Sequence, residues 1–191
     1  MHMANKIVVI LGSPRKNGNS STLAGSLITG AEENGAEVET FFLQGMDIKP
    51  CNACDQCMKS PGSGCIIDDD MQKIYPAVRT AESIVIASPI YWFNITAQTK
   101  LFIDRCYALI ESGGHAFKEK NIGLILVYGD IDPFRSGATN AIRSYQDIFR
   151  YVGAKIAGLI YGSAMSAGQI QKNKQLMKKA YNLGKKLSLK G

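Results

Sequence analysis

Four cysteines stand close together in the first half of the chain, with the spacing Cys51-x2-Cys54-x2-Cys57-x7-Cys65. Four thiolates in one compact group are what a [4Fe–4S] cluster requires as ligands. A zinc site with four cysteine ligands is also chemically reasonable, although two successive x2 spacings are unusual for it. Thiols without metal are the third alternative. The spacing leaves these three open, but it favours metal or redox chemistry over a disulfide scaffold.

A second candidate site follows the apolar run Lys6–Leu11. The next segment, Gly12–Thr22, reads GSPRKNGNSST and leads into a helical pattern. A loop between a strand and a helix presents free backbone N–H groups to an anion, and polar side chains could add hydrogen bonds; these are Ser13, Arg15, Asn19, Ser20, Ser21 and Thr22. The glycine spacing fits neither a nucleoside-triphosphate loop nor a GxGxxG loop. The pattern predicts a site for a terminal phosphate monoester such as that of FMN, and an ordinary helix cap formed by Asn19 or Ser20 is the alternative.

Aromatic residues follow another apolar run, Ser83–Ala87. Three consecutive aromatic side chains in a loop cannot all face a core, and a flat tricyclic ring is a natural partner for stacking. The residues predicted to border such a ring are Pro89, Ile90, Tyr91, Trp92, Phe93 and Asn94. A subunit interface is the alternative role for these aromatic residues. Gly129 and Asp130, which follow a further apolar run, are predicted to complete the pocket.

The elements that must position these residues alternate regularly along the chain. Short apolar runs predict strands at Lys6–Leu11, Glu37–Leu43, Ser83–Ala87, Asn121–Tyr128 and Lys155–Tyr161. Amphipathic patterns predict helices at 20–34, 68–81, 96–110, 138–152 and 169–187. This alternation predicts an α/β, three-layer flavodoxin-like fold, with helices on both faces of a five-stranded parallel sheet of order 2-1-3-4-5. In that order the loops after the first and third strands flank one crevice, so the phosphate and aromatic segments should meet there.

Length and composition bound the remaining possibilities. The 191 residues predict a single domain over 1–191, with a flexible segment at 1–5 and a cysteine-rich insertion loop at 44–67. Seven lysines and no acidic residue lie in 172–191, and without these lysines the net charge of +6 becomes −1. This distribution predicts a solvated helix face and argues against nucleic-acid binding. No run is long enough to span a membrane and no signal-peptide pattern is present, so we expect a cytoplasmic protein.

Three further features carry weaker signals. Asp68–Asp70 could bind Mg²⁺, but adjacent acids at a helix start are more often caps and partners of the helix dipole. Cys106 lies among apolar residues of a predicted helix and is expected to be a small core residue. His115 follows two glycines and is expected to be solvent-exposed, although it could touch substrate.

Three separated segments together resemble one family. They read GSPRKNGNSSTL, CNACDQC and SPIYWFNITAQTKLFIDR, and they resemble the NAD(P)H-dependent FMN reductase family, within it the iron–sulfur flavoprotein branch. The resemblance covers residues 6 to about 106. It implies a flavodoxin-like fold with bound FMN, in a homodimer or homotetramer. It also implies that residues 89–94 border the isoalloxazine and that the FMN phosphate is held by Ser13, Arg15, Asn19, Ser20, Ser21 and Thr22.

The activity that the resemblance implies is FMN-dependent oxidoreduction. NAD(P)H would deliver hydride to the flavin, which would pass electrons to a quinone, a flavin or another small acceptor. No side chain need act as acid or base, because the cofactor supplies the chemistry. The alternative is an electron carrier for a protein redox partner, with FMN and a [4Fe–4S] cluster held by the four cysteines.

Overall fold

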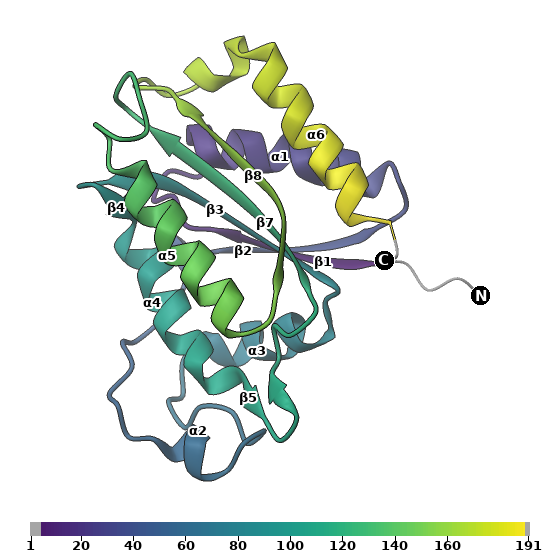
Figure 1. Cartoon of the computed structure of the whole chain (residues 1–191), viewed down its shortest axis with the longest axis vertical. Coiled ribbons are helices and arrows are strands. Elements are labelled where there is room, and N and C mark those ends of the chain that lie inside the picture. The colour runs from purple at the N-terminus through teal and green to yellow at the C-terminus, as the bar shows by residue number, and fades with distance from the viewer. Residues whose placement is uncertain (1–4, 190–191) are drawn as a thin grey trace.

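A central sheet separates two layers of helices in the computed structural model, which describes residues 5–189 (Figure 1). Five strands lie in the order β2-β1-β3-β7-β8, and each neighbouring pair is parallel. Their bounds are Lys6–Leu11 (β1), Glu37–Phe42 (β2), Ser83–Tyr91 (β3), Asn121–Tyr128 (β7) and Lys155–Ser163 (β8). The predicted three-layer α/β fold and the order of its five main strands are confirmed.

Alternate residues of the central strands enter two separate cores. Val8 and Ile10 of β1 pack under the helices α3 (Met71–Thr80), α4 (Ala97–Arg105) and α5 (Ala138–Tyr151). Ile7 and Val9 face the opposite layer, which consists of α1 (Asn19–Glu32) and α6 (Lys174–Leu187). A strand with core on both faces needs a continuous apolar run, and this explains the sequence pattern of β1.

Two glycines allow the helices of the second layer to lie unusually close. A Cβ atom on Gly30 of α1 would lie 2.1 Å from the carbonyl oxygen of Tyr181, and one on Gly184 of α6 would lie 1.9 Å from that of Leu27. Any side chain at either position would therefore push α1 and α6 apart. Figure 1 shows the two helices side by side on one face of the sheet.

Residues 88–95 differ from the prediction of a simple loop. Strand β3 continues to Tyr91, and the short strand β4 (Asn94–Ile95) returns antiparallel to it, with Tyr91 opposite Asn94. The two residues between them form a tight hairpin turn. Helix α4 then begins behind Thr96, whose side chain accepts a hydrogen bond from the backbone N–H of Thr99.

Several short elements lie outside the sequence-based predictions. The cysteine-rich segment holds a 3-10 turn (Leu43–Gly45) and the short helix α2 (Gln56–Lys59), and α4 is followed by a 3-10 helix (Cys106–Leu109). A small hairpin of β5 (Ile110–Glu111) and β6 (Gly114–His115) comes next. A separate 3-10 helix (Gln169–Lys172) precedes α6 because Asn173 caps α6 and accepts a bond from the N–H of Leu176.

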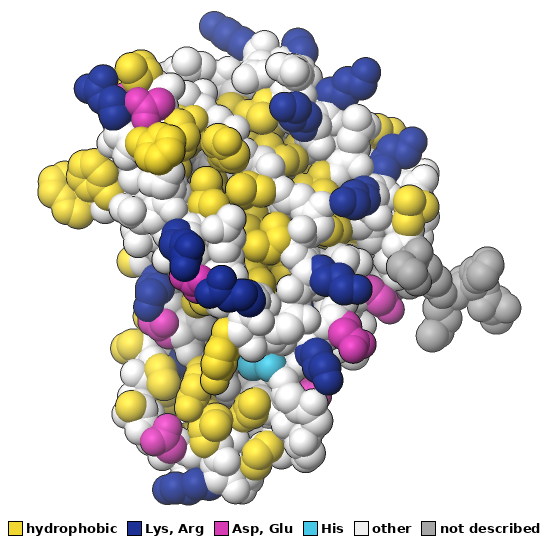
Figure 2. All heavy atoms as spheres, viewed as in Figure 1, with side chains coloured by type: hydrophobic (Ala, Val, Ile, Leu, Met, Phe, Trp, Pro, Cys, Tyr) yellow, Lys and Arg dark blue, Asp and Glu magenta, His cyan; other side chains and the backbone are white. Residues whose placement is uncertain are grey.

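The basic charge near the C-terminus is displayed to solvent as predicted. The lysines of this segment that the structure describes are exposed; they are Lys172, Lys174, Lys178, Lys179, Lys185 and Lys186. Figure 2 shows Lys and Arg side chains spread over this part of the surface. Among residues 5–189, no helix combines the length and apolar character that a bilayer span requires.

The predicted flexible segment, residues 1–5, lies almost entirely outside the described residues. Asn5 is described and is buried. Its side-chain amide donates a hydrogen bond to the carbonyl oxygen of Leu187 at 3.0 Å, and its own carbonyl accepts one from the N–H of Glu37. Asn5 therefore ties the start of β1 to α6 and β2.

Candidate cofactor sites

A cavity of about 250 Å³ lies at the carboxyl ends of the parallel strands. It is lined by predicted residues from three loops, namely Ser13, Arg15, Asn19, Ser20, Pro89, Ile90, Tyr91 and Gly129. The predicted residues that do not line it are Ser21, Thr22, Trp92, Phe93, Asn94 and Asp130. The structure thus brings the phosphate segment and the start of the aromatic segment together, as the strand order required.

The phosphate segment leaves the start of α1 open toward this cavity. The helix begins at Asn19 behind Gly18, and Gly18 has no side chain to cap it. Capping by Asn19 or Ser20, the alternative considered above, is therefore wrong. The first N–H groups of a helix have no intrahelical partners and carry the positive end of its dipole, so this end of α1 suits an anion.

Ser20 provides a test of whether a phosphate fits here. Its side chain is 1% exposed, and its Oγ atom has no hydrogen-bond partner among residues 5–189. A buried hydroxyl without a partner costs free energy, which an acceptor oxygen in the cavity would recover. The residues present therefore fit a phosphate group.

The neighbouring polar side chains of the segment are engaged within the protein. Asn19 donates from Nδ2 to the carbonyl of Ser166 at 2.9 Å and accepts from the N–H of Ile170 at 3.3 Å. Thr22 donates from Oγ1 to the carbonyl of Gly18 at 3.1 Å. Asn19 thus joins α1 to the loop after β8, and Thr22 stabilises the first turn of the helix.

The loop after β8 is the part of this cavity that sequence reasoning missed. Ala164, Met165 and Ala167 line the cavity, together with Val127 and Tyr128 at the end of β7. The sequence could have indicated these residues, because they follow predicted strands and ligands in such folds lie outside the carboxyl ends of the strands. Burial raises the pKa of Tyr128, so its hydroxyl stays protonated near neutral pH.

The tip of the β3–β4 hairpin points away from the cavity. Trp92 and Phe93 have φ values of 48° and 68°, a left-handed conformation that bulky residues rarely adopt. Trp92 is 92% exposed. The turn is held by Asn140 of α5, which donates from Nδ2 to the carbonyl of Phe93 at 3.2 Å.

The four predicted cysteine ligands line a second cavity, of about 240 Å³. Left-handed backbone at Ala53 (φ 54°) and Asp55 (φ 56°) turns the chain sharply between them. Burial raises the pKa of the Cys57 thiol, and the neighbouring thiols of Cys65, Cys51 and Cys54 raise it further. The four cysteines therefore share one cavity.

The arrangement of these thiols bears on which metal group they could hold. Among residues 5–189, no three His, Cys, Asp or Glu side chains are placed to hold one metal ion. A zinc site draws its ligands to about 2.3 Å from a single centre. A [4Fe–4S] cube takes each thiolate on a different iron, so its ligands stand further apart around a larger space. Four thiols around one cavity are a donor set that suits a [4Fe–4S] cluster or a zinc ion.

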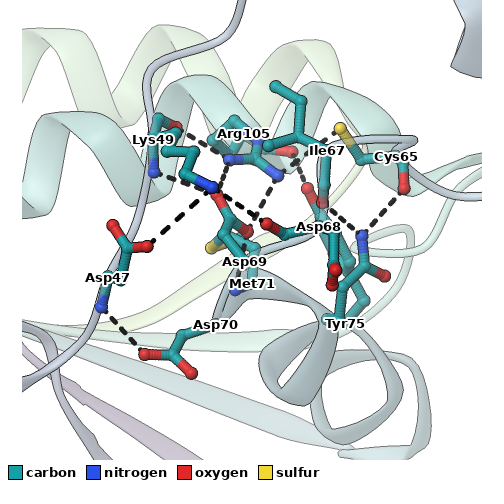
Figure 3. Close-up of polar contacts among 11 residues, drawn as sticks. Asp47, Lys49, Cys65, Ile67, Asp68, Asp69, Asp70, Met71, Tyr75 and Arg105 are labelled. Atoms are coloured by element: carbon teal, nitrogen blue, oxygen red, sulfur yellow. Dashed lines mark hydrogen bonds and ion pairs between the residues drawn. The ribbon is translucent and has the colours of Figure 1, made fainter.

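The acidic run beside the cysteines holds an arginine. Asp69 and Arg105 form an ion pair whose side chains are 0% and 1% exposed (Figure 3). Although burial opposes both charges, their mutual hydrogen bonds lower the pKa of Asp69 and raise that of Arg105. Asp70 accepts a hydrogen bond from the N–H of Asp47 at 2.8 Å and pairs with Lys73. Asp69 also accepts a hydrogen bond from the N–H of Met71, the first residue of α3, at 3.0 Å, whereas Asp70 makes no side-chain cap bond to this helix.

Arg105 is the functional candidate of this region that sequence reasoning missed. It is the last residue of α4 and lines the cysteine cavity, and one of its N–H groups points to Cys65 Sγ at 3.4 Å. Arg105 is 40 residues from Cys65 in the chain. Only the fold could bring the two together.

Cys106 and His115 differ in whether their burial matches the prediction. Cys106 is buried in the core as predicted. His115 is partly buried, and the prediction of an exposed side chain is wrong. Its Nε2 lies 3.0 Å from the carbonyl of Cys106, and its Nδ1 accepts the N–H of Phe117 at 3.1 Å. His115 therefore carries its proton on Nε2 and closes the β5–β6 hairpin.

Comparison with known proteins assigns the chain to one family. Residues 5–168 match the family described as NADPH-dependent FMN reductase. The chain belongs to this family. It is 35% identical over 153 residues to an iron–sulfur flavoprotein of Methanosarcina thermophila (80% of this chain, 77% of that protein). It is 32% identical over 186 residues to one of Archaeoglobus fulgidus (96% and 79%).

A solved structure confirms the architecture of this member of the FMN reductase family. The NAD(P)H:quinone oxidoreductase of Methanothermobacter marburgensis superimposes with a TM-score of 0.72, covering 99% of this chain and all of that one. Their sequence identity is 14%, so the likeness shows the fold alone. The family match supports an FMN-dependent oxidoreductase.

Proposed function

We propose that this protein binds FMN in the cavity at the carboxyl ends of the strands and passes electrons from NAD(P)H to a quinone, a flavin or another small acceptor. The observation that carries the proposal is the buried Ser20 hydroxyl, which has no partner among residues 5–189 and lies at the open start of α1. Hydride acceptance and electron transfer are the chemistry that FMN supplies when bound. Family membership supports the same reading.

Different residues of the cavity would contact different parts of the cofactor. Ser13, Ser20, Arg15 and the N–H groups at the start of α1 would bind the phosphate. Pro89, Ile90 and Tyr91 at the end of β3 would border the ring, with Gly129 opposite them. Ser21 and Thr22 do not line the cavity, so we assign them no contact with the phosphate.

A homodimer or homotetramer is part of this proposal. Large apolar side chains are exposed on the loops near the cavity; they are Trp92, Ile131, Phe134 and Met165. Figure 2 shows hydrophobic side chains projecting beside the β3–β4 hairpin. Exposed aromatic and aliphatic residues of this kind are typical of subunit contacts.

A second candidate function is that of an iron–sulfur flavoprotein that carries electrons to a protein partner. The observation that favours it is the common cavity lined by Cys51, Cys54, Cys57 and Cys65. The relatives from Methanosarcina thermophila and Archaeoglobus fulgidus bear that name. The cluster would add one-electron chemistry, and the four thiols of this chain would hold it.

Substitution of two adjacent serines tests the FMN site. Ser20→Ala removes a hydroxyl that would bind the charged phosphate, so we expect FMN to bind about 10- to 100-fold more weakly, as loss of a charged hydrogen bond predicts. Ser21→Ala is the matched control, since Ser21 does not line the cavity and its Oγ donates to the backbone carbonyl of Arg15. Fluorescence titration of each apoprotein with FMN measures both affinities. Equal affinities for the two variants would contradict the assignment.

One spectroscopic and one analytical measurement separate the candidate functions. Anaerobic mixing of the FMN-loaded protein with NADH or NADPH should bleach the flavin absorbance if it is a reductase. Iron and acid-labile sulfide are then assayed on protein purified without oxygen. Near-equal iron and sulfide, together with slow bleaching, would favour the electron carrier, and rapid bleaching without iron would favour the reductase alone.

A further inference from the structure

A buried arginine connects the two ends of the cysteine segment. Arg105 Nη1 donates to the carbonyl oxygen of Lys49 at 2.7 Å, two residues before Cys51. Its Nη2 donates to Cys65 Sγ at 3.4 Å. The residues between these anchor points carry the other three cysteines, so a single guanidinium closes the segment around the cavity (Figure 3).

The position of this arginine is fixed from several sides. Both terminal nitrogens bond the carboxylate of Asp69, in one case at 3.2 Å to Oδ1. The backbone carbonyl of Arg105 accepts a bond from Tyr75 Oη at 3.1 Å. A planar fork of donors suits such simultaneous contacts, which the point charge of a lysine cannot reproduce.

One donor of the guanidinium is still free. Arg105 Nε is buried and has no partner among residues 5–189, although Arg105 lines the cavity. A fixed positive charge and the Nη2 N–H group therefore lie at the wall where Cys65 stands. Hydrogen bonds and charge near ligand sulfurs are among the factors that set the reduction potential of an iron–sulfur cluster.

We propose that Arg105 is a positioning residue that places the Cys65 sulfur and raises the reduction potential of a [4Fe–4S] cluster held by the four cysteines, with Asp69 moderating that effect. The inference rests on the iron–sulfur candidate of the proposed function. Reduction adds one electron to the cluster, and Arg105 keeps its proton throughout. Its positive charge favours the more electron-rich form, whereas the negative charge of Asp69 opposes it.

Two substitutions with opposite expected effects test this role. Arg105→Lys keeps the charge buried but loses the contact with Cys65, so the ratio of reduced to oxidised cluster at the wild-type midpoint should fall about tenfold, a shift of about 59 mV for one electron. Asp69→Asn leaves Arg105 beside Cys65 without its counter-charge, so the ratio should rise. The potential is measured by electron paramagnetic resonance during an electrode-poised titration.

Arg143→Lys is the matched control, because Arg143 pairs with Asp147 on the exposed face of α5, outside the cysteine cavity. It should leave the potential unchanged. Bound FMN, measured on each sample, reports whether the domain has folded, since the two cavities have no lining residue in common. Unchanged potentials, or shifts in the same direction, in the two cavity variants would reduce Arg105 to a structural residue and overturn the proposal.

A measurement on the unaltered protein covers the case in which neither variant folds. Electron–nuclear double resonance of the reduced cluster in protein labelled with ¹⁵N-arginine should show coupling to a guanidinium nitrogen. Its absence would overturn the proposal for Arg105 while the cluster itself stands. Wild-type protein that takes up no iron and sulfide would instead overturn the cluster, and the inference with it.

Discussion

Thr96 and Gly12 are joined by a hydrogen bond of 2.6 Å from Thr96 Oγ1 to the Gly12 carbonyl oxygen. The bond links the start of α4 with the first residue of the phosphate segment. Arg105 ends the same helix and lines the cysteine cavity. A single short helix thus connects the walls of both candidate cofactor sites.

Removal of the Thr96 hydroxyl should therefore weaken both the fold and FMN binding. Thr96 is 1% exposed, and Thr96→Val leaves the Gly12 carbonyl and the Thr99 N–H without their partner. We expect a loss of about 1–3 kcal/mol in the free energy of unfolding, measured by urea denaturation of the apoprotein. Thr80→Val is the control, because Thr80 is exposed at the end of α3 and bonds only its own helix. Equal losses in the two variants would contradict the linking role.

Gly137 should resist substitution more strongly than a glycine with the same backbone conformation elsewhere. Gly137 (φ 76°) and Gly35 (φ 83°) are both left-handed, but a Cβ on Gly137 would lie 2.6 Å from the backbone of Phe93, whereas nothing lies within 4 Å of one on Gly35. Gly35→Ala should cost about 1–2 kcal/mol from backbone strain alone. Gly137→Ala should cost more and should also displace the β3–β4 hairpin. Denaturation of both variants checks this, and a smaller loss at Gly137 would show that the hairpin yields freely.

Trp92 should carry strain that a different residue would relieve. Its backbone is left-handed and its side chain is 92% exposed, so burial of the side chain does not offset the backbone strain. Asparagine tolerates this conformation and favours such hairpin turns, so Trp92→Asn should raise the free energy of unfolding by about 1 kcal/mol. Trp92→Val should lower it, because a β-branched residue fits this backbone poorly. The comparison is made at protein concentrations where the chain is monomeric. A loss of stability with asparagine would contradict the strain.

The strands followed from the sequence because each is marked by a local apolar run. Their regular alternation with helices then indicated the strand order, and with it the meeting of the phosphate and aromatic segments. The direction in which individual side chains point could not be predicted in the same way. Each residue of a helix is turned by about 100° from the last, so Ser20 faces the cavity while Ser21 does not. The hairpin at Trp92 was missed because bulky residues rarely form such turns. The contact between Arg105 and Cys65 joins residues 40 positions apart, which no local pattern records.

His115 should make the stability of the protein fall as the pH is lowered below about 6.5. Burial lowers the pKa of His115 from its ordinary value of 6.5, against a smaller opposing effect of its bond to the Cys106 carbonyl. In the unfolded chain the imidazole takes up a proton near pH 6.5, whereas the folded protein resists it until a lower pH. The unfolded state then binds more protons, so its free energy falls relative to the folded state.

The sign of this effect can be isolated by one substitution. His115→Gln cannot titrate and keeps an amide that can donate to the Cys106 carbonyl. The difference in free energy of unfolding between wild type and variant, measured by urea denaturation, should be constant above pH 7 and should shift against the wild type between pH 6.5 and 5. The aspartates with lowered pKa values, Asp69, Asp70 and Asp147, lose their contribution only at more acidic pH and do so equally in both proteins. A difference independent of pH would mean that His115 takes up its proton equally well in the folded hairpin, contrary to the bonds at both of its ring nitrogens.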